Sequence, residues 1–184
     1  PSLPADALSG GEIAMFSGYG IICLQWFTGK RITQVFTRAG TFFYDHYREM
    51  RCEDLATVHL RLGDIVGSMT LGRTPVSSEP ARIEVDLTGT DGSLRIDGQS
   101  NTITVLNGQD TIGKGNTRID YTADPAATAR FIDDFVTAVR NGRPPAITAG
   151  ECFDTISVLD AIYRSAHSGH PEKIIDITGY ESPA

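Results

Sequence analysis

Residues 56–71 read ATVHLRLGDIVGSMTL, and this stretch decides the predicted fold class. On each side of Gly63-Asp64 every second residue is apolar or small, and polar residues such as His59 and Arg61 alternate with them. A period of two is typical of a β-strand with one buried face. A glycine–aspartate pair between two such runs is typical of a tight hairpin turn. The stretch therefore predicts two antiparallel strands, at residues 56–62 and 65–71, that share one apolar face.

Strands are also predicted on both sides of this hairpin, at residues 30–39, 81–87, 93–96, 102–106, 117–121 and 173–177. Those that alternate clearly have one apolar and one polar face, which is typical of an antiparallel sheet covered on one side by helices. The fold class is therefore predicted as α+β. We expect an open, mostly antiparallel (mixed) sheet with helices packed on one face, the other face being solvated or packed on another protein.

Three amphipathic helices are available to cover the apolar face. Ser9 and Glu12 form an S-x-x-E capping box before the first, and Thr148 and Glu151 form another before the third. The second begins at Asp124-Pro125, an N-cap followed by a proline at the first helical position. Each helix has one face that is predicted to be buried. In the first helix it consists of Ile13, Phe16, Gly20, Cys23 and Phe27. In the second it consists of Phe131, Phe135, Ala138 and Val139, and in the third of Cys152, Ile156, Leu159, Tyr163 and Ala166.

Composition excludes several classes of partner. The 184 residues contain 16 Lys and Arg and 23 Asp and Glu, a formal net charge of −7. Nucleic acids and anionic membranes attract basic surfaces, so neither is expected to bind this chain. No apolar run has the length of a membrane span. The three cysteines are far apart and form no C-x-x-C motif. We expect buried, reduced thiols and a cytoplasmic location.

Motifs for nucleotides and metals are weak or absent. A dinucleotide site needs a strand and then G-x-G-x-x-G at the start of a helix, and no glycine-rich segment here has that context. His167 and His170 form an H-x-x-H pair at a helix end, where solvated histidines are more common than metal ligands. Glu53-Asp54 is interpreted as a solvated, turn-capping pair.

The first helix, at residues 14–29 (AMFSGYGIICLQWFTG), contains an unusual centre. Gly18 and Gly20 flank Tyr19, although a mid-helix glycine costs about 1 kcal/mol relative to alanine. The spacing i, i+4, i+7 and i+11 places Met15, Tyr19, Ile22 and Trp26 along one stripe. Two interpretations follow. The stripe is a second core face, or Tyr19 faces a cleft in which its small neighbours leave room for a ligand.

Five segments, in this order, resemble the C-terminal domain of the Gfo/Idh/MocA family of NAD(P)-dependent sugar and polyol oxidoreductases. They are SGGEIAMFSGYGIICLQWFTGK, CEDLATVHLRLGDIVGSM, VDLTGTDGSLRIDG, FIDDFVTAVRNGRPP and ECFDTISVLDAIYRSAHSGHPEKI, which together span residues 9–177. Family members carry a Rossmann domain with a catalytic lysine before this region. The resemblance implies that residues 1–184 are one substrate-binding and oligomerisation domain, with residues 1–8 a linker from a missing dinucleotide-binding domain.

The resemblance also implies roles for individual residues. Tyr19 falls where some branches carry a tyrosine, and others a histidine, as the acid/base for the substrate hydroxyl. Met15 and Ile22 fall where the family usually has aspartates. The predicted site is therefore Tyr19 as the catalytic residue, with Met15, Gly18, Ile22, Tyr44 and His46 binding substrate. Because a phenol has a pKa near ~10, it needs a nearby positive charge to act as a base at neutral pH.

Two functions remain open at this point. In the first, the chain is part of an oxidoreductase for a sugar, polyol or similar hydroxyl or carbonyl compound, and it is inactive when isolated. NAD or NADP is then bound mainly by a domain absent from this chain. In the second, the fold is a non-catalytic dimerisation or ligand-binding module. The partners expected are a small-molecule substrate and, through the open sheet face, further copies of the chain; nucleic acid and membrane are not expected.

Overall fold

The hairpin of residues 56–71 forms the centre of a four-stranded antiparallel sheet in the computed structural model, which describes residues 10–73, 82–107 and 117–175. Its strands are β2 (Leu55–Leu62) and β3 (Ile65–Gly72), joined by Gly63 and Asp64. Gly63 has φ of +66°, the left-handed region that favours glycine in a tight turn. β1 (Gln34–Gly40) pairs with β2, and the short β8 (Glu172–Lys173) completes the order β3-β2-β1-β8. The predicted hairpin and its buried face are confirmed.

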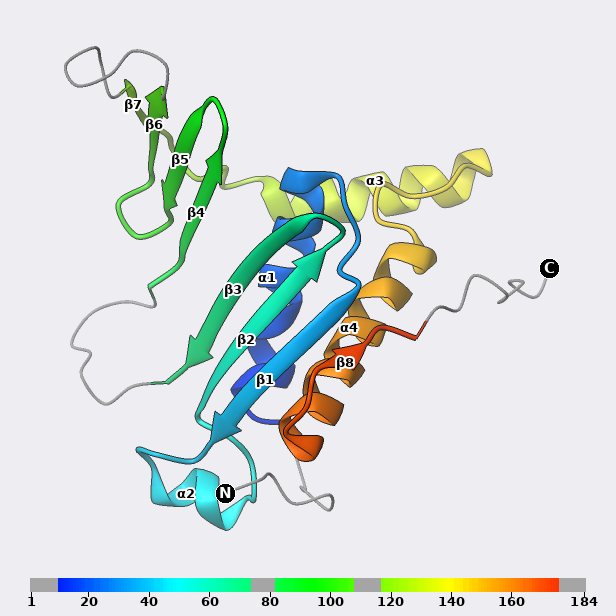
Figure 1. The fold of residues 1–184 in the computed structure, drawn as a ribbon. Coiled ribbons are helices and arrows are strands. Elements are labelled where there is room, and N and C mark those ends of the chain that lie inside the picture. The colour runs from blue at the N-terminus through cyan, green and yellow to red at the C-terminus, as the bar shows by residue number, and fades with distance from the viewer. Residues whose placement is uncertain (1–9, 74–81, 108–116, 176–184) are drawn as a thin grey trace. The chain divides into compact units, whose positions relative to one another are not determined.

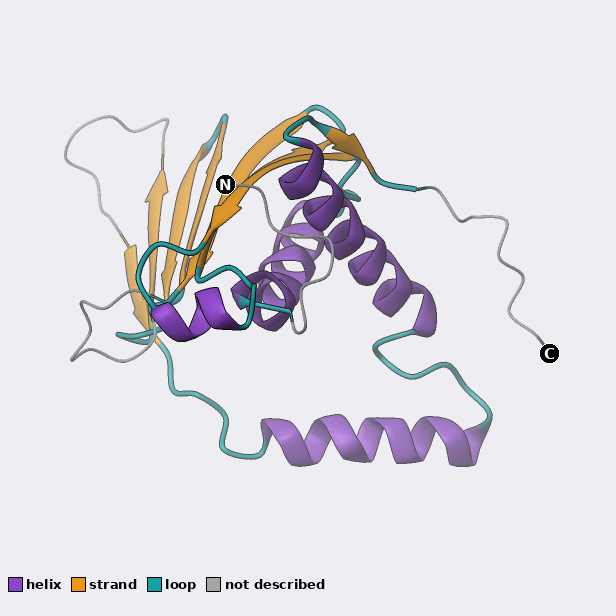
Figure 2. Ribbon diagram, turned by 90° about the horizontal axis from the view of Figure 1, so that it is seen from below, coloured by secondary structure: helices purple, strands orange, loops and turns teal. Residues whose placement is uncertain are grey.

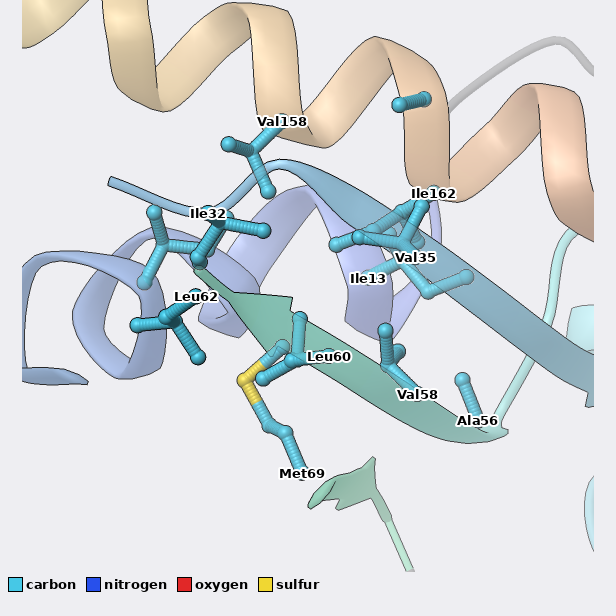
Figure 3. Packing of buried hydrophobic residues seen from close by; sticks show 12 residues of the cluster. Ile13, Ile32, Val35, Ala56, Val58, Leu60, Leu62, Met69, Val158 and Ile162 are labelled. Carbon is cyan, nitrogen blue, oxygen red and sulfur yellow. The ribbon is translucent and has the colours of Figure 1, made fainter. Parts of the chain in front are cut away.

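The chain divides into two compact units, residues 1–75 with 147–184 and residues 76–146. The first unit contains the sheet just described together with α1 (Glu12–Thr28), α2 (Asp45–Glu49) and α4 (Ala149–Ser168). In this unit α1 and α4 cover the same face of the sheet (Figures 1 and 2). The buried cluster between them is built by the alternating residues of β2, with Ile13 and Ile21 from α1 and Val158 and Ile162 from α4 (Figure 3).

In the second unit the described residues form another four-stranded antiparallel sheet, in the order β4-β5-β6-β7, and one helix. Its strands are β4 (Glu84–Gly89), β5 (Gly92–Asp97), β6 (Thr102–Asn107) and β7 (Thr117–Asp120), and its helix is α3 (Ala127–Asn141). Consecutive strands pair in register as a meander. The α+β class is therefore confirmed. All the pairings between described strands are antiparallel, and they form two sheets.

The buried faces of all three predicted helices differ from the sequence prediction. On α1 the buried residues are Glu12, Ile13, Ser17 and Ile21, so only Ile13 of the predicted stripe is buried, and Phe16, Gly20, Cys23 and Phe27 are partly exposed. On α4 the buried side chains are Thr155, Val158, Ala161, Ile162 and Ser165. Cys152 and Ile156, predicted to be buried, are exposed. Small residues face inward because α4 packs closely on α1 and β1. The pattern of hydrophobic residues along α4 does not indicate where such close packing needs small side chains. On α3, Phe131, Phe135 and Val139 are exposed and Ala138 is buried.

Helix ends follow the predicted signals in part. The Thr148–Glu151 capping box is present, and Gly29 and Gly169 end α1 and α4 in the left-handed conformation. Ser9, the linker 1–8 and residues 176–177 of the last predicted strand lie outside the described residues. Within the described part of the chain, no helix combines the length and apolar character that crossing a membrane requires.

Candidate functional site

The stripe predicted on α1 lies on the surface. Met15, Tyr19, Ile22 and Trp26 are 58%, 72%, 49% and 76% exposed, although three of the four are apolar. The interpretation of this stripe as a second core face is therefore wrong. A contiguous exposed patch of large apolar side chains is typical of a contact site. Tyr19, with its phenol directed to solvent, is the one titratable group among these four residues.

The two glycines beside Tyr19 have different neighbours. A Cβ at Gly20 would lie 2.3 Å from the Sδ atom of Met69, which is buried on β3. Gly20 therefore allows α1 to pack closely on the sheet, so packing alone accounts for it. A Cβ at Gly18 would meet only the Cγ2 atom of Thr155, at an ordinary contact distance of 3.9 Å. Packing does not require glycine at position 18.

A buried carboxylate lies at the N-terminal end of the same face. Glu12 precedes Tyr19 by seven residues, two helical turns, and is 1% exposed. Its Oε1 atom accepts hydrogen bonds from the Tyr47 hydroxyl and, at 3.1 Å, from Nε of Arg73. Burial, and then the contact with Glu12, raises the pKa of Tyr47. The side chain of Glu12 is thus engaged with α2 and the end of β3. The N-cap residue of α1 is Gly11, and Ser9 of the predicted S-x-x-E box lies outside the described residues.

The N-terminus of α1 is instead held by Glu53, which is also 1% exposed. Its Oε1 accepts hydrogen bonds from the Ile13 N–H at 2.8 Å and from the Tyr163 hydroxyl at 3.3 Å. Burial raises the pKa of Glu53, and nearby Glu12 adds to the shift. Gly11 is needed at this contact because a Cβ there would lie 2.2 Å from the Glu53 carbonyl oxygen. The interpretation of Glu53 as solvated is wrong; it joins α1, β2 and α4.

Asp54, the neighbour of Glu53, positions the segment that carries Tyr44 and His46. It is fully buried and accepts hydrogen bonds from the backbone N–H groups of Phe42, Phe43 and Tyr44 at 2.8, 2.7 and 3.0 Å. The predicted capping role is therefore correct, and the predicted solvation is wrong. The fixed backbone leads directly into α2.

The aromatic rings of α2 form one group beside Glu12. The rings of Tyr44 and His46 lie 5.4 Å apart, and those of His46 and Tyr47 lie 4.7 Å apart. Tyr47 connects this group to Glu12. The structure thus brings Met15, Tyr19 and Ile22 together on one helix face, and Tyr44 and His46 together on α2. Among the described residues Tyr19 makes no hydrogen bond or ring contact to either of the latter two.

Sequence reasoning missed Glu12, Tyr47, Arg73 and Tyr163 as members of one polar cluster with Glu53. The partners of Glu53 come from residues 40 and 110 positions away. No local spacing signals such contacts. The one available hint was Gly10-Gly11, because adjacent glycines at a helix start indicate that another part of the backbone approaches closely.

The described residues do not fit a dinucleotide or a metal ion. Pyrophosphate binds at helix N-termini through free N–H groups and the positive end of the helix dipole. Here Glu53 occupies that position on α1, Glu151 on α4, and Asp124 precedes α3. The carboxylate at the N-terminus of each of these three helices repels phosphate. Within the described residues no group of three or more His, Cys, Asp or Glu side chains has the geometry to hold a metal ion.

Comparisons with known proteins identify the family. Residues 6–174 match the family model described as "Oxidoreductase family, C-terminal alpha/beta domain", of the Gfo/Idh/MocA group. A comparison with the curated proteins finds no match. Among solved structures, an oxidoreductase domain protein from Kribbella flavida aligns with a TM-score of 0.77 and 19% identity, covering 91% of this chain and 51% of that one.

Two further structures share the fold. The WlbA dehydrogenase from Bordetella pertussis, in complex with NADH and UDP-GlcNAcA, aligns with a TM-score of 0.70 and 20% identity over 91% of this chain and 46% of its own. The myo-inositol 2-dehydrogenase from Lactobacillus plantarum aligns with a TM-score of 0.68 and 21% identity over 90% and 49%. The chain thus spans about half the length of each. With a family match over residues 6–174, this chain belongs to the Gfo/Idh/MocA oxidoreductase family, as its C-terminal alpha/beta domain.

Proposed function

We propose that this chain is the substrate-binding and oligomerisation part of an NAD(P)-dependent oxidoreductase that acts on a sugar, polyol or similar hydroxyl or carbonyl compound. The observation that carries the proposal is the exposed stripe of α1, in which Tyr19 is the one residue with an ionisable side chain. The family match supports the reaction class, and solved dehydrogenases of similar fold support the substrate class. In this proposal residues 1–184 act as one functional domain.

The chemistry assigned to this chain is proton transfer at the Tyr19 hydroxyl. Oxidation of an alcohol to a carbonyl releases a proton from the hydroxyl group as hydride leaves the carbon. A tyrosinate placed on that hydroxyl accepts the proton, and in the reverse direction the phenol donates it to the carbonyl oxygen. Met15 and Ile22 carry no ionisable group, so within the stripe the proton has no other acceptor. Tyr19 requires a positive charge nearby, and none of the described residues provides one in contact with it.

Substrate binding is assigned to the surroundings of Tyr19. Met15 and Ile22 form apolar walls one turn to either side of Tyr19, and Gly18 adds no side chain beside it. Tyr44 and His46 are proposed to contact the substrate from α2, whose backbone Asp54 holds in place. NAD or NADP is assigned to a domain outside this chain. The carboxylates at the described helix N-termini support this assignment, because they repel a pyrophosphate.

Steady-state kinetics of Tyr19→Phe tests the role of the phenol. The intact protein encoded by the gene is assayed against a panel of sugars and polyols with NAD⁺ and NADP⁺, following nicotinamide absorbance. General acid–base catalysis contributes about 10²–10⁴-fold, so kcat of Tyr19→Phe should fall by roughly that factor. Tyr44→Phe is the matched control, with an expected effect on KM and little on kcat.

Two outcomes contradict the proposal. Turnover by Tyr19→Phe equal to that of the wild type would remove the catalytic role of Tyr19 and leave the reaction class intact. If the intact protein binds neither dinucleotide by calorimetry and forms a stable oligomer, the fold serves as a non-catalytic dimerisation or ligand-binding module.

A further inference from the structure

A cavity of about 470 Å³ lies in the first unit, where the end of β1 meets the C-terminal end of α4. Its walls include Arg38 from β1, Phe42 from the following loop, Leu55 and Thr57 from β2, and His167 and Ser168 from α4. This volume is within the usual range for small-molecule sites. None of its lining residues comes from α1, which carries Tyr19.

The charge of this cavity is opposite to that of the chain. The formal net charge is −7, yet the described lining residues include an arginine and a histidine and no carboxylate. The nearby carboxylate of Glu172 is neutralised, because Nη1 of Arg164 contacts its Oε2 at 2.6 Å. Electrostatics in the cavity therefore favour an anion.

Arg38 is held in place while its hydrogen-bonding capacity remains unused. The guanidinium carbon lies 5.0 Å from the centroid of the Phe36 ring. On the other side a Cβ at Gly169 would lie 3.3 Å from Nη1, so the guanidinium packs against the backbone that ends α4. Within the described residues Arg38 donates to no carboxylate and no carbonyl. Most other described arginines are in salt bridges, for example Arg95 with Asp86 and Arg143 with Asp134.

Stabilisation of the α4 C-terminus does not account for Arg38. The Ser165 carbonyl already accepts from the Gly169 N–H at 2.9 Å, and the His170 carbonyl accepts from the Ser165 hydroxyl at 2.6 Å. A planar guanidinium with free N–H groups matches an oxyanion in charge and in geometry. Thr57 adds a hydroxyl group, and Phe42 and Leu55 add an apolar wall. The Ser168 hydroxyl is engaged, because it donates to Oε1 of Glu172 at 3.0 Å.

We propose that this cavity binds a small organic anion, whose carboxylate or phosphate group is held by Arg38 and whose apolar part lies against Phe42 and Leu55. The site is independent of the proposed chemistry at Tyr19. Arg38 and Thr57 also lie on the sheet face assigned to the proposed homo-oligomer, so a bound anion and a second copy of the chain would compete there. Carboxylate and phosphate share the recognition by Arg38, and separate probes distinguish them.

Binding is tested by NMR titration of the ¹⁵N-labelled 184-residue chain with benzoate, inorganic phosphate and benzamide. Benzamide has the ring of benzoate without its charge. We expect saturable shifts at the Arg38 Nε–H and the Gly169 amide with benzoate, phosphate or both, and none with benzamide. Arg38→Gln should raise Kd at least about tenfold, as expected for loss of charge-assisted hydrogen bonds.

Matched variants separate this site from general effects of charge and folding. Arg61→Gln removes an arginine on the neighbouring strand that does not line the cavity, and Kd should not change. Arg38→Lys keeps the charge without the planar fork and should bind more weakly than the wild type. Phe42→Ala should weaken benzoate binding and leave phosphate binding intact. The proposal is overturned if neither anion saturates, if benzamide binds as well as benzoate, or if Arg38→Gln, with a thermal midpoint like that of the wild type, binds unchanged.

Discussion

Glu53 is the residue on which the placement of α1 depends most. It accepts hydrogen bonds from the first turn of α1 and from Tyr163 of α4, although its own backbone lies next to the start of β2. A buried group that satisfies two donors is costly to remove, because both donors are left without a partner and without water. The placement of Tyr19, two turns along α1, therefore depends on a residue far from it in sequence.

Glu53→Ala should lower the free energy of unfolding by about 2–4 kcal/mol, since it leaves the Ile13 N–H and the Tyr163 hydroxyl unsatisfied in a buried position. Urea denaturation followed by circular dichroism measures the change. Glu49→Ala, an exposed glutamate on α2, is the control and should change stability by less than about 0.5 kcal/mol. Equal effects of the two substitutions would show that Glu53 does not hold α1.

The pH dependence of stability provides a second test at this residue. Because burial raises the pKa of Glu53 above its ordinary value of 4.5, the folded state binds a proton that the unfolded state has released. The contribution of Glu53 to the free energy of unfolding should therefore fall as the pH rises from 4.5 to the pKa of the folded state, and then stay constant.

Glu53→Gln lacks this titration but keeps an acceptor oxygen, so it isolates the effect. Relative to Glu53→Gln, the wild type should lose stability as the pH rises through that window. The lowered pKa values of exposed carboxyls such as Asp134 act in both proteins and cancel in the difference. Urea unfolding at several pH values gives the comparison, and a difference that is constant or grows with pH contradicts the assignment.

At the scale of the element, α1 departs from simple helix propensity for two separate reasons. Gly20 lies against Met69 of β3, and Gly18 faces open space apart from Thr155. A helix that must approach a sheet closely loses more by a steric conflict than it gains from a better propensity. One of the two glycines is therefore structural, and the other is available to function.

Gly18→Ala should stabilise the chain by about 0.5–1 kcal/mol, because the added methyl group meets no close neighbour and alanine is the better helix former. Gly20→Ala should lack this gain or destabilise, because Met69 would have to move inside the core. Thermal and urea unfolding of both variants give the comparison. A larger gain from Gly20→Ala would contradict the packing argument.

The helices also show where hydrophobic patterns are insufficient. The strands of the central hairpin were predicted correctly, because period two divides a strand unambiguously into an inner and an outer face. On α4 the prediction chose the larger side chains, whereas the closely packed face is lined by Thr155, Ala161 and Ser165. The Ser165 hydroxyl also accepts from the Thr37 N–H at 2.9 Å, at a point where β1 extends beyond β8. Such a bond depends on the packing partner and not on the pattern of α4.

At the scale of the molecule, the described helices of the first unit, α1 and α4, cover one face of the first sheet and not the other. The other face has Phe36 and Arg38 on β1, Thr57 and His59 on β2, and Val66 on β3. The rings of Phe36 and His59 are stacked 6.3 Å apart, and Val66 is 82% exposed. The proposed homo-oligomer uses this face.

Val66→Asp should shift the protein toward the monomer, because it places a charge on the sheet face that the proposed oligomer would bury, at a position now occupied by an apolar side chain. Sedimentation equilibrium measures the assembly state. Ile156→Asp, which places the same charge at an exposed apolar position on α4, is the matched control and should leave the oligomer intact. Assembly that resists Val66→Asp and fails in Ile156→Asp would locate the interface on the helices.

The sequence by itself determined the α+β class, the central hairpin, the C-terminal end of α1 and both ends of α4, and the resemblance of five segments indicated the family. The predicted elements rest on local periodicity, capping and turn residues, which act between neighbours in the chain. The tertiary structure decided which faces of α4 and α1 are buried, that Tyr19 lies on the surface, and that Glu12, Glu53, Tyr47, Arg73 and Tyr163 form one cluster. The physical reason is that burial and buried hydrogen bonds depend on which distant segments of the chain come into contact. The spacing of residues along the chain does not predict these contacts.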